Sequence, residues 1–589
     1  MIDRNKPERV KLVARMTSRS RQHCRVRRTT LAAAVLWAAA ACAPARPPAP
    51  GPGPGAIAPA ETGVGAASDA AFALAAENAR AANEAFVRSR RLMRDWLTFA
   101  DPASGLLPRH LQGEGLDIWN AQDTSADLYP FLVLTAYFTD PALYQGRMID
   151  ILRAETTLTS RLDRLPDTYS FSKNGFAFDT PDLTRILFGS SEYVKDGLLP
   201  ITEFLGETPW RARMFGMLDD IWRHAPIDTP RGRIPSDNPE VNGNMLQALS
   251  RAYWMTKEAR YLEQAVRLGE YYLVDGHHPT RDFETLRLRD HGNEIVSGLT
   301  EFYATISKVD PGKAARYRAP MHAMLDRILE VGRNEDGLFY NVIDPRAGTP
   351  VNPGVADNFG YILNGFYAVY LLDGTEAYRD AVRRALSSLD PKYRGFDWES
   401  LGQDGDADAV EGALNLYNRE PVASAAAWID YQTHWMWTKQ DWAHRPNTER
   451  WRGRGVVEGA YADGNFNRTS IMYALWKTGG THVQPWRPDV VYGATRDGRA
   501  LLVSLRADTA WTGALHFDPP RHRTHMGMPM DWPRMNQFPE WFTVEAGRRY
   551  EVRDAARGTR NVRTGAELLR GLAIELSAKL ETRLVVRPL

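Results

Sequence analysis

The sequence has few cysteines and almost no net charge. Its 589 residues include only Cys24 and Cys42, and the formal net charge is +1. A disulfide framework and a cysteine-based zinc site are therefore excluded for the rest of the chain. Nucleic acid is not indicated as a partner, because its recognition calls for a basic domain or stripe. The apolar share of 43% and the charged share of 25% are typical of a globular protein.

Several catalytic signatures are missing as well. The sequence contains no glycine-rich phosphate loop, no nucleophile elbow and no HExxH motif. The 13 histidines have no paired spacing of the kind that metal sites use. We therefore expect neither a catalytic metal nor a cofactor.

The N-terminus resembles a bacterial export signal. Three arginines precede an apolar run at 31–41, which is too short to span a bilayer. Small residues then lead to Cys42, as at a lipoprotein cleavage site. We predict a signal peptide at 1–42 with lipidation at Cys42, and a Pro/Gly/Ala-rich tether at 43–71. The protein would then be a periplasmic or outer-membrane lipoprotein of a Gram-negative bacterium. In the alternative, a plain signal peptide is cut nearby and Cys42 is incidental.

Two kinds of helix alternate between residues 72 and 484. One kind is amphipathic, as at 312–333, where apolar residues recur at helical spacing among charges. The other kind is apolar or small nearly all round, which is typical of a buried helix. This alternation predicts a mainly α fold, an (α/α)6-type toroid with six or seven helical hairpins. An α-solenoid is the alternative.

The last hundred residues have a different pattern. Alternating apolar runs at 485–589, with a hairpin signal at Asp497-Gly498, predict a small all-β sandwich domain. We expect this domain to cover an edge of the ring or to assist formation of a homodimer.

Each buried helix begins with a cluster of polar residues, for example DHGNE at 290–294. In a ring of parallel inner helices, these N-termini open on one face, so the clusters are expected to line one cavity. Asn293 or Asp290 would serve there as an ordinary helix cap.

Two features within these clusters suggest chemistry. Asp408 and Glu411 lie three residues apart on one helical face and would raise each other's pKa, which suits a general acid. Arg468 lies one turn into a buried helix and calls for a carboxylate partner, either Asp463 or the substrate.

Carboxylates of the clusters are the candidate catalytic residues: Glu294, Asp357 and Glu411, followed by Asp408 and Asp463. The candidate substrate-binding residues are His291, Asp123, Asp127, Asn242, Asn358, Tyr361, Glu458, Asn465 and Arg468. Simpler roles as helix caps, dipole-complementing charges or solvated acidic turns stay open for them. The chain also has 17 tryptophans and 23 tyrosines, and sugar binding combines aromatic faces with carboxylates and amides.

Four of the buried segments carry a family resemblance: DHGNEIVSGLTEFY, DNFGYILNGFYAVY, DADAVEGALNLYNREPV and DGNFNRTSIMYALWKT. They resemble a bacterial carbohydrate-active family of α/α toroids with a C-terminal β-domain, the β-glucuronidase-like glycoside hydrolase family 154. The resemblance spans about residues 75–589. The same scaffold also carries unsaturated-uronyl hydrolases and polysaccharide lyases, so the fold alone does not choose among them.

We therefore predict a glycoside hydrolase that releases a uronic acid, β-glucuronate, from a polysaccharide, with two carboxylates flanking the scissile bond. The first alternative is a polysaccharide lyase that acts on uronate-containing glycans by β-elimination through His291, Tyr361, Asn465 and Arg468. The second is a glycan-binding lipoprotein without turnover.

Overall fold

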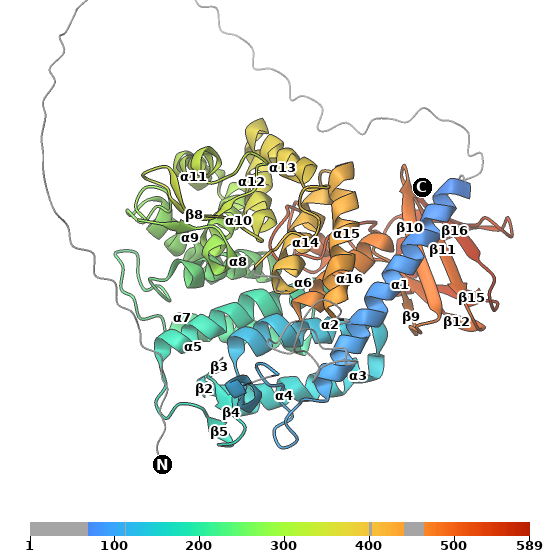
Figure 1. The fold of residues 1–589 in the computed structure, drawn as a ribbon, viewed down its shortest axis with the longest axis horizontal. Coiled ribbons are helices and arrows are strands. Elements are labelled where there is room, and N and C mark those ends of the chain that lie inside the picture. Colours follow the sequence, from blue (N-terminus) through green and yellow to red (C-terminus); the bar gives the residue numbers. More distant parts are fainter. Residues whose placement is uncertain (1–68, 112, 400–402, 441–463) are drawn as a thin grey trace, which may run out of the picture. The chain divides into compact units, whose positions relative to one another are not determined.

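The computed structural model describes residues 69–111, 113–399, 403–440 and 464–589 (Figure 1). All of them belong to one unit that runs from Thr62 to Leu589. Helices dominate this unit as far as Lys477, and strands dominate from His482 onwards. In the described part, no helix combines the length and the apolar character needed to cross a bilayer.

Amphipathic and buried helices alternate along the chain, as the sequence predicts. The amphipathic set consists of α1 (Asp69–Leu97), α4 (Arg147–Thr159), α7 (Pro209–Arg223), α9 (Ala259–Leu273), α11 (Pro311–Val331), α13 (Glu376–Ser388) and α15 (Ala423–Gln440). The buried set consists of η2 (Ala121–Leu128) with α2 (Tyr129–Thr139), α5 (Leu183–Glu192) with η3 (Tyr193–Leu198) and α6 (Leu199–Leu205), α8 (Pro239–Thr256), α10 (Glu294–Val309), α12 (Phe359–Asp373), α14 (Gln403–Tyr417) and α16 (Asn465–Lys477).

The buried helices close into a ring. Helix α2 packs against α6, and the α5–η3–α6 run packs against α8. The series continues through α10, α12 and α14 to α16, which packs against α2 again. An open α-solenoid is thereby excluded, because its terminal repeats would not meet. Within the described residues the toroid has seven hairpins, the larger of the two predicted numbers, and the predicted fold class is confirmed.

Glycines allow the buried helices to approach one another closely. A Cβ on Gly298 of α10 would lie 2.5 Å from the carbonyl oxygen of Gly243 in α8. A Cβ on Gly360 of α12 would lie 2.3 Å from the Cα of Gly412 in α14. Neither approach leaves room for a side chain. Gly243 and Gly298 lie in the first two turns of their helices, so this crossing brings the N-termini of α8 and α10 together, whereas Gly360, at the start of α12, meets the third turn of α14.

Short elements fill the connections between the long helices. Three small antiparallel sheets consist of β1 (Ile118–Trp119) with β4 (Tyr169–Ser170) and β5 (Gly175–Phe176), β2 (Ser160–Leu162) with β3 (Leu165–Pro166), and β6 (Leu286–Arg287) with β7 (Tyr340–Asp344) and β8 (Thr349–Val355). The short helices are η1 (Gly113–Asp117), α3 (Pro141–Gln145) and η4 (Asp290–Asn293).

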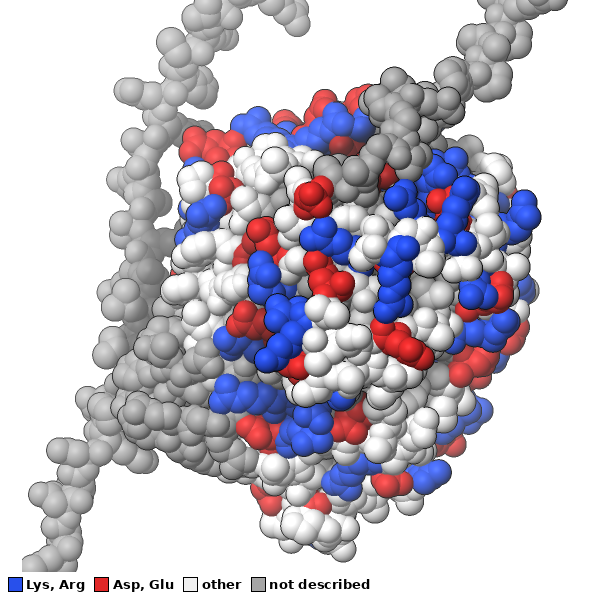
Figure 2. All heavy atoms as spheres, turned by 90° about the vertical axis from the view of Figure 1, so that its right-hand side faces the viewer, with Lys and Arg blue, Asp and Glu red and all other residues white. Residues whose placement is uncertain are grey.

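The C-terminal region contains two antiparallel sheets. The larger has the order β10 (Val490–Asp497), β11 (Ala500–Ala507), β16 (Thr582–Pro588), β13 (Arg549–Asp554) and β14 (Arg560–Thr564), and the smaller has the order β15 (Leu572–Leu576), β12 (Trp511–His516) and β9 (His482–Gln484). Pairing of Asp497 with Ala500 confirms the predicted hairpin. On the face seen in Figure 2, which carries these sheets, basic and acidic side chains are intermixed. The remaining helix of this region, besides α17 below, is α18 (Gly565–Arg570).

The connection between β12 and β13, residues 517–548, is the main feature that the sequence did not predict; we call it the inserted segment. The sequence predicts alternating strands throughout 485–589, but after β12 the next strand, β13, begins only at Arg549. The segment holds one short helix, α17 (Arg521–Thr524). Its Met526, Met528 and Trp532 pack against Trp254, Ala304 and Ala368, one residue from each of α8, α10 and α12. This C-terminal region therefore reaches into the helical ring rather than only covering its edge.

A candidate active site at the helix N-termini

One pocket collects side chains from the N-terminal ends of the buried helices. Its lining comprises Asp127, Asp196, Asp290, His291, Asn293, Glu294, Asn358, Tyr361, Asp404, Asp408, Asn465, Arg468, Met535 and Asn536. Thirteen of the fourteen are polar, and six are carboxylates. The polar clusters that the sequence identified thus meet in one cavity.

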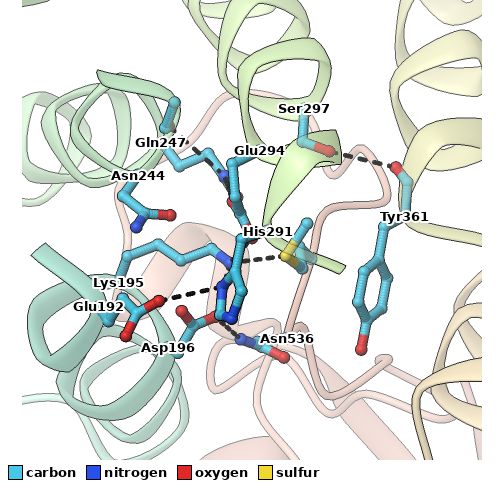
Figure 3. Close-up of polar contacts among 12 residues, drawn as sticks. Glu192, Lys195, Asp196, Asn244, Gln247, His291, Glu294, Ser297, Tyr361 and Asn536 are labelled. Atoms are coloured by element: carbon cyan, nitrogen blue, oxygen red, sulfur yellow. Dashed lines mark hydrogen bonds and ion pairs between the residues drawn. The ribbon is translucent and has the colours of Figure 1, made fainter. Parts of the chain in front are cut away.

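Glu294 lies in this pocket, but both of its carboxylate oxygens are engaged. Lys195 donates to Oε1 at 2.6 Å, and Gln247 donates to Oε2 at 2.6 Å (Figure 3). Burial raises the pKa of Glu294 to about 7, although Lys195 opposes the shift. With both oxygens occupied, Glu294 is placed to hold Lys195 rather than to exchange protons with a substrate.

Lys195 is a buried lysine that joins several of these groups. Burial would lower its pKa, but the neighbouring Asp196 and Glu294 carboxylates raise it overall. Its ammonium group lies 2.6 Å from Asp196 Oδ1 and contacts the sulfur of Met535. Asn536 donates a second hydrogen bond to the same Asp196 oxygen at 2.7 Å. Asp196 is therefore held in place by η3 and by the inserted segment together.

Asp127 and Asp404 have a different environment from Asp196. In the described part of the chain, Asp127 has no hydrogen-bond or ion-pair partner for its carboxyl group, and Asp404 accepts one hydrogen bond, from Asn465 at 2.7 Å. Burial raises the pKa of both groups well above the usual range for aspartate. Nearby carboxylates add to the shift, with Asp404 acting on Asp127 and Asp408 acting on Asp404. Both groups are therefore suited to keep a proton at a higher pH than an ordinary aspartate does.

Arg468 has the carboxylate partners that the sequence called for, but they come from α14. Its Nη2 lies 2.5 Å from Asp408 and its Nε lies 2.8 Å from Glu411. Glu411 is fully buried, accepts hydrogen bonds from Tyr361 and the Asn536 backbone at 2.7 Å, and does not line the pocket. We do not retain Glu411 as a catalytic candidate, because the protein already uses its carboxylate. Asp463, the other proposed partner, lies outside the described residues.

The side-chain cap that the sequence predicts at α10 is not formed, and α12 lacks one as well. Helix α10 has Asn293 at its N-cap position without a capping bond, and Asn293 instead donates to the Asp290 carbonyl oxygen at 2.5 Å. Helix α12 has Asn358 at its N-cap position, also without a capping bond. Asn358 accepts from the Asp290 N–H and donates to Asp408 at 2.7 Å. The asparagine thus links η4 to α14 across the pocket.

Three further candidates lie outside the pocket lining. Asp357 is buried, and its pKa is raised to about 7 by burial and by Asp408. Asp123 is ion-paired with Arg109 at 2.8 Å. Asn242 is fully buried, and it donates to the Ser236 carbonyl and to the Tyr272 hydroxyl. These environments indicate structural roles. Glu458 and Cys42 lie outside the described residues.

His291 lies at the pocket wall, beside two glutamates. Its Nδ1 is 3.0 Å from Glu192 Oε1 and 3.2 Å from Glu240 Oε1, and its Nε2 is 3.1 Å from Asp290 Oδ1. Burial opposes protonation of the imidazole, but the carboxylates, led by Glu192, raise the pKa of His291 well above its usual value. Burial raises the pKa of Glu240 to about 9.

Sequence inspection missed the residues from η3, the end of α5 and the inserted segment. Lys195 and Asp196 are charged residues within a buried helical run, and charges within a buried helix are a usable signal. Met535 and Asn536 belong to a long stretch without strand alternation, and connections of that length are often functional. Only the fold brings either stretch to the pocket.

No protein-family model and no curated protein matches the chain. Solved structures with a similar course of the chain include an inactive variant of an α-1,6-mannanase from Salegentibacter sp., 12% identical, covering 66% of this chain and 97% of its own, with a TM-score of 0.38. A family 76 glycoside hydrolase from Bacteroides thetaiotaomicron is 12% identical over 67% of this chain and 98% of its own, with a TM-score of 0.36. Cellobiose 2-epimerase from Bacillus thermoamylovorans is 11% identical over 67% and 97%, with a TM-score of 0.35. At these sequence identities and TM-scores, none of the activities of these proteins is assigned to this chain.

Proposed function

We propose that this protein is a glycoside hydrolase that releases a uronic acid, β-glucuronate, from a polysaccharide by carboxylate acid/base catalysis. One observation carries the proposal: carboxylates that differ in their partners lie together in one pocket at the helix N-termini. Asp127 and Asp404 have raised pKa values, whereas Asp196 and Asp408 accept hydrogen bonds from cations. Such a division is what a glycosidase needs to separate its acid from its base or nucleophile.

Asp127 is our candidate for the general acid. It is the pocket carboxyl group without a partner in the described residues, so its proton is free to move to the leaving glycosidic oxygen. Asp404, whose carboxyl group raises the pKa of Asp127, would help to keep that proton in place.

Asp196 is our candidate for the base that activates water or for the nucleophile. Lys195 and Asn536 fix one of its oxygens, which leaves the other free to face the sugar. In this scheme Glu294 acts through Lys195 and is a positioning residue rather than the acid that the sequence suggested.

Protonation of Asp127 and Asp404 supports the proposed specificity for a uronic acid. Six ionised carboxylates would repel an anionic sugar, but Asp127 and Asp404 are neutral when they carry protons. The sugar carboxylate would then bind beside Arg468. This predicts that KM for an aryl β-glucuronide rises with pH, whereas KM for an aryl β-glucoside does not.

Substrates with different leaving groups test these roles. Asp127→Asn should lose about 10²–10⁴-fold in kcat/KM on an oligosaccharide and far less on a nitrophenyl glucuronide, whose leaving group needs little protonation. Asp196→Asn should lose activity on both. The Asp150→Asn variant, at an exposed ion pair, is the control. Near-full activity of both Asp127→Asn and Asp196→Asn on oligosaccharides would rule out the assignment.

The lyase alternative has less support. Both imidazole nitrogens of His291 face carboxylates, and the Tyr361 hydroxyl donates to Glu411, so neither is poised to remove a proton from a uronate. Absorbance of an unsaturated product in the same assays would detect a lyase, and binding without turnover would indicate a non-catalytic glycan receptor.

A further inference from the structure

Three potential metal ligands meet where consecutive hairpins adjoin. Glu192 ends α5, Glu240 is the second residue of α8, and His291 lies in η4. One nitrogen or oxygen atom from each lies within 4.8 Å of the other two. Figure 3 shows the Glu192 carboxylate and the His291 ring facing one another. We call this group the Glu–Glu–His cluster.

Two oxygen atoms of this cluster are buried without a hydrogen bond. Glu192 is 2% exposed, and in the described part neither Glu192 Oε1 nor Glu240 Oε1 has a partner in hydrogen-bond geometry. The His291 Nδ1 atom lies within 3.2 Å of both but has at most one proton to donate. Buried carboxylate oxygens left in this state are costly unless a cation satisfies them.

The spacing of the three atoms suits a cation between them. Two ligands that are each about 2.1 Å from a metal lie about 3.0 Å apart at right angles and about 3.4 Å apart in a tetrahedron. The Nδ1–Oε1 separations are 3.0 Å and 3.2 Å. The second imidazole nitrogen faces Asp290 at 3.1 Å, and a carboxylate on the second nitrogen is the usual partner of a metal-bound histidine.

We propose that Glu192, Glu240 and His291 bind a divalent transition-metal cation at the wall of the pocket. One imidazole with two carboxylates suits Zn²⁺ or Mn²⁺ better than Ca²⁺ or Mg²⁺, which prefer oxygen ligands alone. Three protein ligands leave coordination positions open for water or another oxygen. The proposal does not depend on the hydrolase assignment, because it concerns binding only.

A second grouping supplies a comparison. His522, Asp531 and Glu540 also lie within ligand distance of one another. There, however, Asp531 is already ion-paired with Arg419 at 2.5 Å and with Arg534 at 2.9 Å. Because guanidinium groups supply the positive charge there, we propose no metal at this second grouping, and it serves as a control.

Titration calorimetry and thermal unfolding test the proposal on chelator-treated protein. We expect wild type to bind about one equivalent of Zn²⁺ or Mn²⁺ and to show a higher Tm with the metal. Glu192→Gln and Glu240→Gln should each weaken the affinity at least about 10-fold. The control Glu540→Gln should leave it unchanged. No uptake by wild type, or equal uptake by Glu240→Gln, would show that the imidazole instead bridges the two carboxylates without a cation.

X-ray absorption of Co²⁺-loaded wild type covers the case in which the variants fail to fold. One nitrogen among the cobalt ligands is expected. A spectrum with oxygen ligands only would overturn the proposal.

Discussion

Two buried groups of charges within the same ring behave in opposite ways. In the pocket, six carboxylates share the lining with Arg468 and His291, and the pKa values of Asp127 and Asp404 are raised. A second group, which we call the arginine network, is made of Glu203, Arg251, Glu301, Arg534, Asp531 and Arg419.

In the arginine network, each carboxylate has a guanidinium partner. Arg251 pairs with Glu301 at 2.5 Å, and Arg534 bridges Glu203 and Asp531. Burial opposes ionisation there too, but the arginines hold the pKa of Glu203 and Asp531 below their usual values. Carboxyl groups that are buried to a comparable degree therefore have pKa values shifted in opposite directions in the two groups. The number of neighbouring cations decides the direction of the shift. One group secures the inserted segment to the helices, and the other keeps protons available for chemistry.

Removing an arginine from the arginine network should have the largest effect on stability. Arg534→Met leaves Glu203 and Asp531 short of a partner, and breaking such a buried pair costs about 3–5 kcal/mol of unfolding free energy. Denaturant unfolding measures this change. Arg153→Met, at an exposed pair with Asp150, is the control and should cost at most about 1 kcal/mol. A similar loss in both variants would mean that the arginine network does not differ from a surface ion pair.

Removing the buried carboxyl group of Asp357, which lies beside the pocket and whose pKa Asp408 raises, should stabilise the protein. The folded-state pKa of Asp357 is about 7, above its unfolded value. The protonated Asp357 carboxyl group therefore contributes to the free energy of unfolding below about pH 4. This contribution is lost as the pH rises through about 7. Asp357→Asn should be the more stable protein above pH 7, by up to about 3–4 kcal/mol.

Urea unfolding at pH 4, 6 and 8 tests this sign. The advantage of Asp357→Asn should grow across the series, whereas Asp150→Asn, at an exposed site, should give a flat difference. An advantage of Asp357→Asn that shrinks with pH would contradict the proposed desolvation.

The hydrogen bond between Asn536, in the inserted segment, and Asp196, in the pocket, should affect kcat. Asn536 follows the arginine network in the inserted segment and hydrogen-bonds Asp196 in the pocket. We expect Asn536→Gly to lower kcat by about 10–100-fold with little change in KM, because Asp196 would lose part of its orientation. Asn536 has a φ of 59°, so Asn536→Ala should lose similar activity and also about 1 kcal/mol of stability. Unchanged kcat in both variants would remove Asn536 from the site.

The smallest effect is expected at a carboxylate outside both groups. Asp123 is paired with Arg109 away from the pocket lining. Asp123→Asn should therefore change kcat/KM by less than about 2-fold, since a side chain outside the pocket makes no contact specific to the transition state. A loss of more than about 10-fold would restore Asp123 as a substrate-binding residue.

Much of the fold could be predicted because the local pattern of apolar and polar residues indicates which helices are buried. Helices without a polar face, such as α10 and α12, were recognisable as buried, and their polar N-termini pointed to a common cavity. The individual roles could not be predicted in the same way. Glu294 and Asp127 belong to similar clusters, yet Lys195 and Gln247 occupy the first, and the second has no partner in the described residues.

The sequence by itself determined the alternation of helices, the position of the polar clusters and most of the pocket lining, because these depend on residues close together in the chain. Tertiary structure decided which carboxylates keep a proton. That outcome depends on cations distant in the chain, such as Lys195 beside Glu294 and Arg534 beside Glu203. A pKa responds to the few ångströms around a group, and only the folded ring sets those neighbours.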